Sequence, residues 1–337
     1  MSQLDFVALG DMVTDDFIEI QRDVRIDTDP DPEDKGYDEI CFRFGDKTPY
    51  EKSVVVPAVG NSPNAALSAT RLGLKTALIT DTGDDDRGQE QITRLKENAI
   101  DCRWVDQHAG MPSNYHYVLR YGPERTILIK HHQYPYEVPS DLAETAPKWL
   151  YFSSIGEHGM DYHHAIAAFL KDNPETKLAF QPGSFQIDVG YDALKDVYAE
   201  TDILFCNKEE AQRILSTKED TIPMLLGMIR ERGPQIAVIT DGPQGAYAYN
   251  GSEIWMIPMY PDPAPPVDRT GAGDAFSSTF TSAIALGMNI PDALRWGPIN
   301  SMSVVQYIGA QEGLLTREKL EEYLAKAPAD YVPKKLI

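Results

Sequence analysis

The chain has few of the features that characterise secreted, zinc-binding or membrane-spanning proteins. Its 337 residues include only three cysteines, Cys41, Cys102 and Cys206, with no CxxC spacing. This suggests neither a disulfide framework nor a zinc ribbon, so we expect buried free thiols. No run approaches the roughly 20 apolar residues of a transmembrane helix, and residues 1–10 lack the basic, then apolar layout of a signal peptide. We therefore expect a cytoplasmic protein.

Basic residues are also scarce relative to acidic ones. Lysine and arginine number 31 and aspartate and glutamate 52, which gives a formal net charge of −21. Such a charge repels nucleic acid and anionic lipid over most of the surface, and no basic patch offsets it, so neither is an expected partner. The 42% of hydrophobic residues and 25% of charged ones are ordinary globular values, which argue against disorder.

Short apolar runs alternate with helical stretches along most of the chain. This alternation predicts an α/β fold in which helices cover both faces of a mainly parallel sheet, a three-layer α/β/α sandwich. Ligands then lie beyond the carboxyl ends of the strands. The expected strands are 6–9, 76–80, 149–153, 177–180, 203–206 and 236–240, and the expected helices are 63–72, 88–98, 163–171, 192–199, 208–215 and 223–232.

Two regions interrupt the alternation. Residues 17–59 contain an acidic loop, 27–35, between β-like pieces at 17–20, 39–44 and 53–56. Residues 114–131 read as a hairpin with a turn at 121–124. We expect insertions at about 17–59 and 112–133 to form a small second sheet, a lid over the site.

The segment DRTGAGDAF, residues 268–276, carries the clearest chemical signal. Apolar residues at spacings i, i+4, i+7 and i+8 begin at Phe276 and predict a helix that starts near Gly273. A glycine-rich turn before a helix gathers backbone N–H groups at its positive end, which suits phosphate. Asp274 would repel that anion unless it has a function, such as accepting a proton from an attacking hydroxyl. The alternative is that Asp274 only complements the helix dipole and the glycines only form a turn.

Other phosphate-binding motifs fit less well. The dinucleotide pattern GxGxxG fails because Phe276 occupies the third glycine position, which disfavours an oxidoreductase. No GxxxxGK[ST] sequence exists, which excludes a P-loop, and the HRD and DFG elements of protein kinases are missing.

The 268–276 segment resembles the C-terminal signature D-T-x-G-A-G-D of the ribokinase family, also called the pfkB carbohydrate kinases. Other family motifs occur in the expected order between residues 10 and 313, so the resemblance spans nearly the whole chain and implies one ribokinase-like domain, 1–337. These motifs are Gly10 with Asp15, Gly60 with Asn64 and Ala65, Arg71-Leu72-Gly73, Asn207-Lys208-Glu209-Glu210, Thr240-Asp241-Gly242-Pro243-Gln244-Gly245 and Gly309-Ala310-Gln311.

Three departures from the family pattern concern the substrate rather than the phosphoryl chemistry. Val59 replaces the first glycine of the N-terminal pair, and Arg269 stands where the family usually has threonine. Gln181-Pro182-Gly183 replaces the D-x-N that many sugar-kinase members carry.

The resemblance implies a role for each matching residue. Asp274 would be the general base, and the N–H groups of Gly271, Ala272 and Gly273 would form the anion hole for the transferred phosphoryl group. The remaining implied roles are acceptor binding by Asp15, Gly60 and Asn64, nucleotide binding by Thr240, Gly242 and Gly245, Mg²⁺ binding through water by Asn207 and Glu210, and K⁺ binding at Asp268, Thr270, Gly309 and Gly313.

Taken without the resemblance, several of these residues have ordinary structural interpretations. Asn207 with Glu210 is a common helix start, and the 240–245 motif is typical of a turn between strands. Asp15 alone would be a solvated loop acid. Histidines at 131–132 and 158–164 raise a rival, a transition-metal site, but their spacing matches no familiar pattern.

The sequence therefore predicts an ATP-dependent kinase, with Mg²⁺ and K⁺ as cofactors, that phosphorylates a hydroxymethyl group of a small sugar. A nucleoside kinase of the same family and a catalytically inactive relative that binds a sugar or a protein partner stay open as alternatives. The phosphate donor, ATP against ADP or GTP, is also open. Exposed lid strands make a homodimer plausible, since open sheet edges invite partners.

Overall fold

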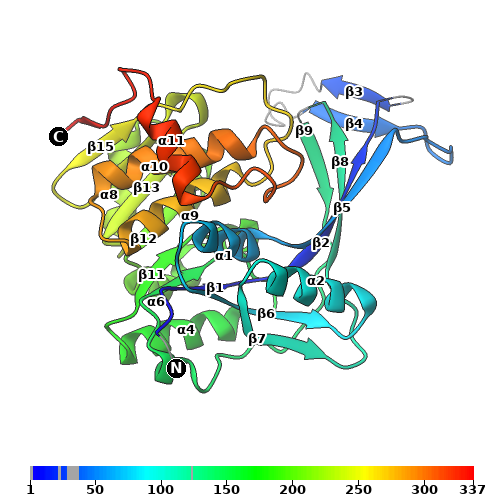
Figure 1. Ribbon diagram of the computed structural model, residues 1–337, viewed down its shortest axis with the longest axis horizontal. Coiled ribbons are helices and arrows are strands. Elements are labelled where there is room, and N and C mark those ends of the chain that lie inside the picture. The colour runs from blue at the N-terminus through cyan, green and yellow to red at the C-terminus, as the bar shows by residue number, and fades with distance from the viewer. Residues whose placement is uncertain (1–2, 22–23, 29–37, 123) are drawn as a thin grey trace.

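A ten-stranded sheet runs through the centre of the protein (Figure 1). The computed structural model describes residues 3–21, 24–28, 38–122 and 124–337. The strands of this sheet, in chain order, are β1 (Phe6–Leu9), β6 (Thr76–Gly83), β7 (Asp101–His108), β10 (Trp149–Phe152), β11 (Lys177–Phe180), β12 (Ile203–Asn207), β13 (Ile236–Thr240), β14 (Ala246–Tyr249), β15 (Ile254–Ile257) and β16 (Lys334–Lys335).

Most of this sheet is parallel. Its order is β16-β15-β14-β13-β12-β11-β10-β1-β6-β7, and the strands from β13 to β7 all run the same way. Only β14, β15 and β16 pair antiparallel. Between β10 and β1 the chain order reverses, and such a switch point is where α/β sheets bind ligands.

Helices on the two faces of the sheet complete three layers. Alternate residues of a strand point to opposite faces, and accordingly Phe6 and Ala8 of β1 join one core whereas Val7 and Leu9 join the other. The first core is covered by α1 (Asn61–Arg71), α2 (Asp86–Glu97), α9 (Ala272–Ala285), α10 (Ile290–Val304) and α11 (Arg317–Ala325). The second is covered by α4 (Met160–Asp172), α6 (Lys195–Ala199), α7 (Lys208–Ile214) and α8 (Ile222–Arg230), with the short helices α3 (Leu142–Thr145) and α5 (Ser184–Val189).

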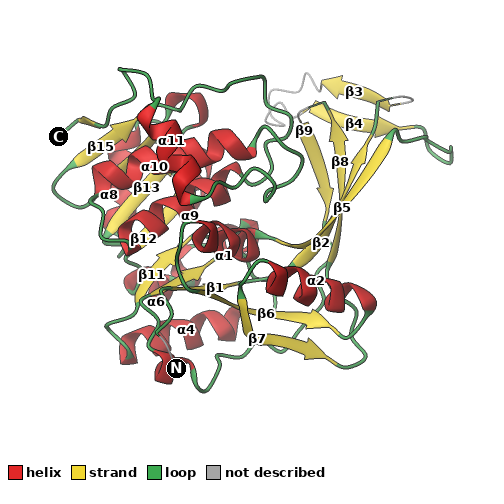
Figure 2. Cartoon of the chain, in the orientation of Figure 1, coloured by secondary structure: helices red, strands yellow, loops and turns green. Residues whose placement is uncertain are grey.

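A separate four-stranded sheet stands beside this body (Figure 2). Its order is β5-β2-β8-β9, formed by β2 (Val13–Glu19), β5 (Lys52–Val59), β8 (Tyr115–Tyr121) and β9 (Glu124–Leu128). The two expected insertions therefore do pair with each other. A further antiparallel pair is formed by β3 (Val24–Thr28) and β4 (Asp38–Phe42). Most of the expected acidic loop, 27–35, lies outside the described residues.

The six expected strands of the main sheet are confirmed, with ends within three residues of the prediction. The expected helix 192–199 is wrong in part. It is divided into a 3₁₀ turn, Tyr191–Ala193, and α6, because Leu194 leaves the helical region at φ −114° and ψ 17°.

The prediction of three buried thiols is also wrong in part. Cys206 is buried in β12, whereas Cys41 and Cys102 are only half-buried, and all three are free. None of the helices in the described ranges combines the length and the hydropathy that crossing a membrane requires.

Candidate active site

The glycine-rich turn lies at the N-terminus of α9, as the sequence predicts. Gly271 has φ 80°, and a Cβ there would lie 2.2 Å from the Cβ of Ala310, so only glycine fits. Its carbonyl accepts the N–H of Ala275 at 2.8 Å and starts the helix. The first N–H groups of a helix have no partner within it, and together with the helix dipole they form a site suited to an anion.

Asp274 is buried in the first turn of α9, with its carboxylate directed at three amide groups. Asn61 Nδ2 and Gln181 Nε2 donate to Oδ1 at 2.8 and 3.1 Å, and Asn64 Nδ2 donates to Oδ2 at 2.8 Å. Burial raises the pKa of Asp274, and these three donors oppose the rise by stabilising the charged form. The result is a fixed carboxylate suited to accept a proton.

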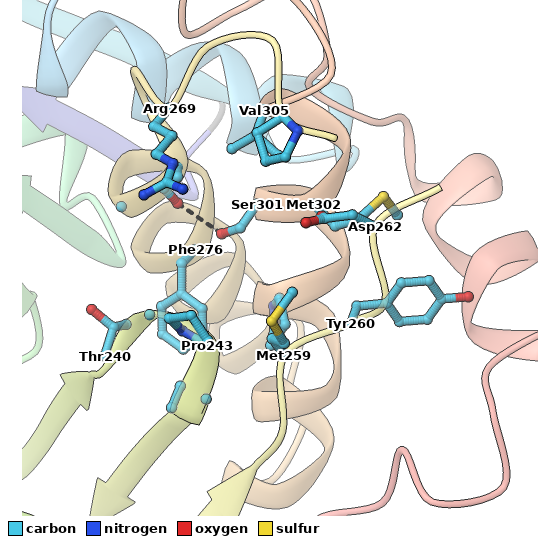
Figure 3. A pocket seen from close by; sticks show the side chains of 17 residues that line it. Thr240, Pro243, Met259, Tyr260, Asp262, Arg269, Phe276, Ser301, Met302 and Val305 are labelled. Atoms are coloured by element: carbon cyan, nitrogen blue, oxygen red, sulfur yellow. Dashed lines mark hydrogen bonds between the residues drawn. The ribbon is translucent and has the colours of Figure 1, made fainter. Parts of the chain in front are cut away.

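A cavity of about 290 Å³ opens beside the same turn (Figure 3). Ala272 and Gly273 form part of its wall, and Ser301 Oγ donates to the Ala272 carbonyl at 2.7 Å. Apolar side chains and prolines form most of the remaining wall, which suits a flat aromatic base. The other lining residues are Thr240, Gly242, Pro243, Gly245, Ala246, Met259, Tyr260, Asp262, Pro266, Arg269, Phe276, Pro298, Met302 and Val305.

The structure brings the three expected nucleotide residues to this cavity. Thr240 ends β13, and Gly242 and Gly245 adopt positive φ values of 49° and 99° in the turn that follows. A Cβ at Gly245 would lie 2.1 Å from the Ile257 carbonyl oxygen, so the turn itself requires this glycine. These residues therefore form a turn after a strand and also line the cavity, so the two interpretations of the 240–245 motif do not exclude each other.

Asn207 and Glu210 form a reciprocal cap at the start of α7. Asn207 Oδ1 accepts the N–H of Glu210, and Glu210 Oε2 accepts the N–H of Asn207, both at 2.8 Å. Burial raises the pKa of Glu210, and the charge of Asp274 adds to the rise. The role of the pair toward Mg²⁺ stays a prediction.

Asp268 joins the two loops that were expected to bind K⁺. Its side chain is fully buried, with Oδ1 accepting from Thr270 N and Oγ1 at 2.9 and 2.8 Å and Oδ2 accepting from Gly309 N at 2.9 Å. Gly313 packs so closely that a Cβ would lie 2.5 Å from the Ser303 carbonyl oxygen. These contacts hold the loops together, and cation binding there stays a prediction.

The expected acceptor residues lie near one another at the switch point. Gly60, with φ 120°, precedes α1, and a Cβ there would lie 2.7 Å from the carbonyl oxygen of Asp11. Asp15 lies on β2, largely buried. The amide of Asn64 is engaged at both ends, since its oxygen also accepts from Gln311 Nε2 at 3.1 Å.

Asp11, His116 and His131 belong to the same region; Asp11 was not predicted, and His131 was considered only for a metal site. His131 Nδ1 lies 2.6 Å from Asp11 Oδ2, and His116 Nδ1 lies 3.3 Å from Asp15 Oδ1. The Nε2 atoms of the two histidines are 3.3 Å apart, which connects the carboxylates of Asp11 and Asp15 through two rings. Asp11 follows the first strand directly, and this position at a strand's carboxyl end was the signal that could have found it.

Arg125 is a second residue that sequence reasoning missed. It pairs with Arg120 in the β8–β9 ladder, so the two side chains share the inner face of the small sheet. Arg120 is buried and donates to the Val267 carbonyl at 2.7 Å. The buried Nε of Arg125 has no hydrogen-bond partner among the residues that the structure describes. After burial, which raises the pKa of Asp274, and the three amides, which lower it, the charge of Arg125 lowers this pKa further. Arg125 therefore places a positive charge within electrostatic reach of Asp274.

The rival idea of a histidine metal site finds no support in the part of the chain that the structure describes. That part contains no group of three or more His, Cys, Asp or Glu side chains placed to hold a metal ion. His163 Nδ1 donates to the Gly159 carbonyl at 2.6 Å, and His164 faces Asp196 instead.

Comparison with known proteins agrees with this geometry. The sequence profile described as pfkB family carbohydrate kinase matches residues 34–317. Fructoselysine 6-kinase of Escherichia coli (strain K12) is 26% identical over 255 residues, 74% of this chain and 90% of that protein. Ribokinase of Bacillus subtilis (strain 168) is 28% identical over 279 residues, which cover 79% of this chain and 87% of that protein. The structure of Arabidopsis thaliana ribokinase complexed with ribose and ATP has the same fold, with a TM-score of 0.79 at 18% identity over 96% of this chain and 99% of that one.

Proposed function

The chain belongs to the pfkB family of carbohydrate kinases, and from that premise we propose that it transfers a phosphoryl group from ATP to a hydroxymethyl group of a small sugar. Its membership makes it a phosphotransferase. The observation that supports the proposal is the position of Asp274. Its carboxylate is fixed by three amides directly after a glycine-rich helix N-terminus that lines a cavity.

The main chain at residues 271–273 and the Asp274 side chain would divide the chemistry between them. Bound ATP would supply the phosphoryl group and leave as ADP, and Mg²⁺ bound with it would neutralise charge on the phosphates. The N–H groups of Gly271, Ala272 and Gly273 stabilise the negative charge that builds on the phosphoryl oxygens in the transition state. Asp274 takes the proton of the attacking hydroxyl.

The binding roles follow from the cavity and its neighbours. Thr240, Gly242 and Gly245 contact the nucleotide, because all three line the cavity. Asn207 and Glu210 would hold Mg²⁺ through its bound water. Backbone carbonyls of the loops joined by Asp268 would hold K⁺.

The acceptor would lie between Asp15, Asn64 and Asp274, at the switch point of the sheet. Carboxylate and imidazole groups lie side by side there, from Asp11, His131, His116 and Asp15. They can donate hydrogen bonds to several hydroxyls, or accept hydrogen bonds from them, at once, as a polyhydroxylated ligand needs.

The small sheet would act as a lid. Its inner face carries Arg125 toward Asp274, so closure would exclude water and add a positive charge near the phosphoryl group. Its open edges, β5 and β9, could pair between two copies to give a homodimer. A cytoplasmic location also stays a prediction.

The test is a coupled kinase assay with ATP and Mg²⁺ on six acceptors: ribose, fructose, 2-keto-3-deoxygluconate, adenosine, inosine and cytidine. We expect phosphorylation of a sugar. Turnover of the nucleosides alone would favour the nucleoside kinase alternative. Binding of a sugar without turnover of any acceptor, with ATP, ADP or GTP as donor, would favour an inactive relative.

A further inference from the structure

Gln181 occupies the place where many family members carry the aspartate of D-x-N, and its side chain contacts the expected base directly. It follows β11, and its backbone N–H donates to the Phe152 carbonyl of β10 at 2.9 Å. Its Nε2 donates to Asp274 Oδ1 at 3.1 Å. The residue that departs from the family pattern therefore lies beside the expected base, between two central strands.

Two hydroxyl groups fix the orientation of the Gln181 amide. The hydroxyl of Tyr151 on β10 donates to Gln181 Oε1. Ser277 Oγ on α9 lies 2.8 Å from the same oxygen, 2.6 Å from the Tyr151 hydroxyl and 2.8 Å from the Gly273 carbonyl oxygen. Burial raises the pKa of Tyr151 well above its ordinary value, which keeps this phenol protonated as a donor. With Oε1 held by hydroxyls, the NH₂ end must face the carboxylate, because a carbonyl oxygen there would be repelled.

We propose that Gln181 is a positioning residue for the phosphoryl transfer, whose amide, oriented by the hydroxyl groups beside it, donates to the Asp274 carboxylate and holds it in one orientation. This inference rests on the proposed function of Asp274 as the base. The three contacts bring β10, β11 and α9 to one point, so the sheet itself fixes the direction of the carboxylate.

The proposal has a consequence for the pH profile. The donors to Asp274 stabilise its charged form against burial, so removal of one donor raises the pKa of the base. A hydrogen bond to a charged group is worth about a factor of ten or more, which corresponds to about one pH unit. The acid limb of kcat/KM should therefore move upward by about one unit in Gln181→Met, which keeps the length of the side chain and removes its donor.

Gln186, five residues further along on α5, offers a matched control. It is a buried glutamine whose Nε2 donates to the Ser153 carbonyl at 2.9 Å and whose Oε1 accepts from Gly183 N at 3.0 Å, with no contact to Asp274. Gln186→Met removes buried hydrogen bonds of the same kind and should leave the acid limb in place.

The experiment measures kcat/KM against pH for wild type, Gln181→Met, Gln186→Met and the isosteric Gln181→Glu, with thermal unfolding of each. We expect Gln181→Met to be about tenfold slower than wild type at acid pH and to recover toward it at alkaline pH. Tyr151→Phe should shift the acid limb in the same direction by less. Gln181→Glu should shift it further than Gln181→Met, because a second carboxyl disfavours ionisation of the first.

Two outcomes would overturn the inference. One is an unchanged acid limb in folded Gln181→Met or, where that variant does not fold, in Gln181→Glu. The other is an equal shift in Gln186→Met. Asp274→Asn separates this failure from failure of the proposed function. If Asp274→Asn is active, Asp274 is not the base and the proposed mechanism is wrong. If Asp274→Asn is inactive and the acid limb of Gln181→Met is unshifted, only the positioning role of Gln181 is wrong.

Discussion

The Asp274 carboxylate shows what a sequence motif reveals about a single residue and what it leaves out. The motif at 268–276 was enough to predict Asp274, and Asn64 came from a second motif. Asn61 and Gln181 were not predicted as its partners, because they lie 213 and 93 residues away along the chain. Such contacts are set by how helices dock on the sheet, and no local pattern encodes that docking.

At Gly271 we predict that alanine impairs both folding and catalysis. A positive φ costs a non-glycine residue about 1–2 kcal/mol, and a Cβ here would also collide with Ala310. We expect this overpacking to lower the free energy of unfolding of Gly271→Ala by about 1–3 kcal/mol beyond the backbone cost. We also expect Gly271→Ala to lower kcat. Thermal unfolding and steady-state kinetics measure the two effects.

Gly287 provides the control for this prediction. It has a similar φ, 88°, but no atom within 4 Å of where a Cβ would lie. Gly287→Ala should show the backbone cost alone and keep kcat. Equal kcat values in the two variants would contradict the importance of the turn at 271.

At Glu210 the helix cap and the expected Mg²⁺ role can be separated. Glutamine also closes a capping box, so Glu210→Gln should unfold at nearly the wild-type temperature while losing the charge. We expect the Mg²⁺ concentration for half-maximal activity to rise about tenfold, in line with the loss of one charge-assisted contact. The same substitution at the exposed neighbour, Glu209→Gln, is the control and should leave the Mg²⁺ dependence unchanged. An unchanged Mg²⁺ dependence in Glu210→Gln would show that Asn207 and Glu210 only cap the helix.

At the scale of elements, strands with continuous apolar sequences were predicted well. Elements whose sequences mix polar and apolar residues were not. The buried parallel strands such as β1 and β11 read as continuous hydrophobic runs, because helices cover both of their faces. The edge strand β7, DCRWVDQH, is half-exposed and polar, so its sequence did not indicate a strand. Similarly, α10 contains Gly297 and Pro298, which obscure its helical pattern.

The lid sheet supports a prediction about Arg125. Because Arg125 is placed near Asp274 without an ion pair among the described residues, methionine there should lower kcat by about tenfold or more while the Kd for ATP changes little. Arg25 of β3 is the control, since its side chain is 72% exposed and pairs with Asp27. A kcat for Arg125→Met equal to that of Arg25→Met would show that the lid adds no charge to the reaction.

At the scale of the whole molecule, the layered body and the separate sheet follow from the order of strands and helices in the sequence. What the sequence did not predict is how the two sheets face each other, because this depends on contacts such as that between Arg120 and the Val267 carbonyl. The open edge of β9, where Leu128 is 52% exposed, is the surface on which the expected homodimer depends.

A sizing experiment with light scattering tests that expectation. We predict a particle of twice the 37.6 kDa chain mass, and a monomer for Leu128→Lys, since a charged edge strand resists pairing. A wild-type protein that elutes as a monomer at micromolar concentration would contradict it.

The most direct test of the account compares the turnover of wild type and Asp274→Asn on the sugar that the acceptor assay identifies, over a range of pH. Asparagine keeps the size of the side chain and removes the proton acceptor, so we predict a loss of about 10²–10⁴-fold in kcat with the Kd for ATP retained. Because burial raises the pKa of Asp274, the wild-type rate should fall as pH drops through that raised value, and the asparagine variant should lack this limb. Equal turnover by the two proteins would contradict the assignment of Asp274 as the base.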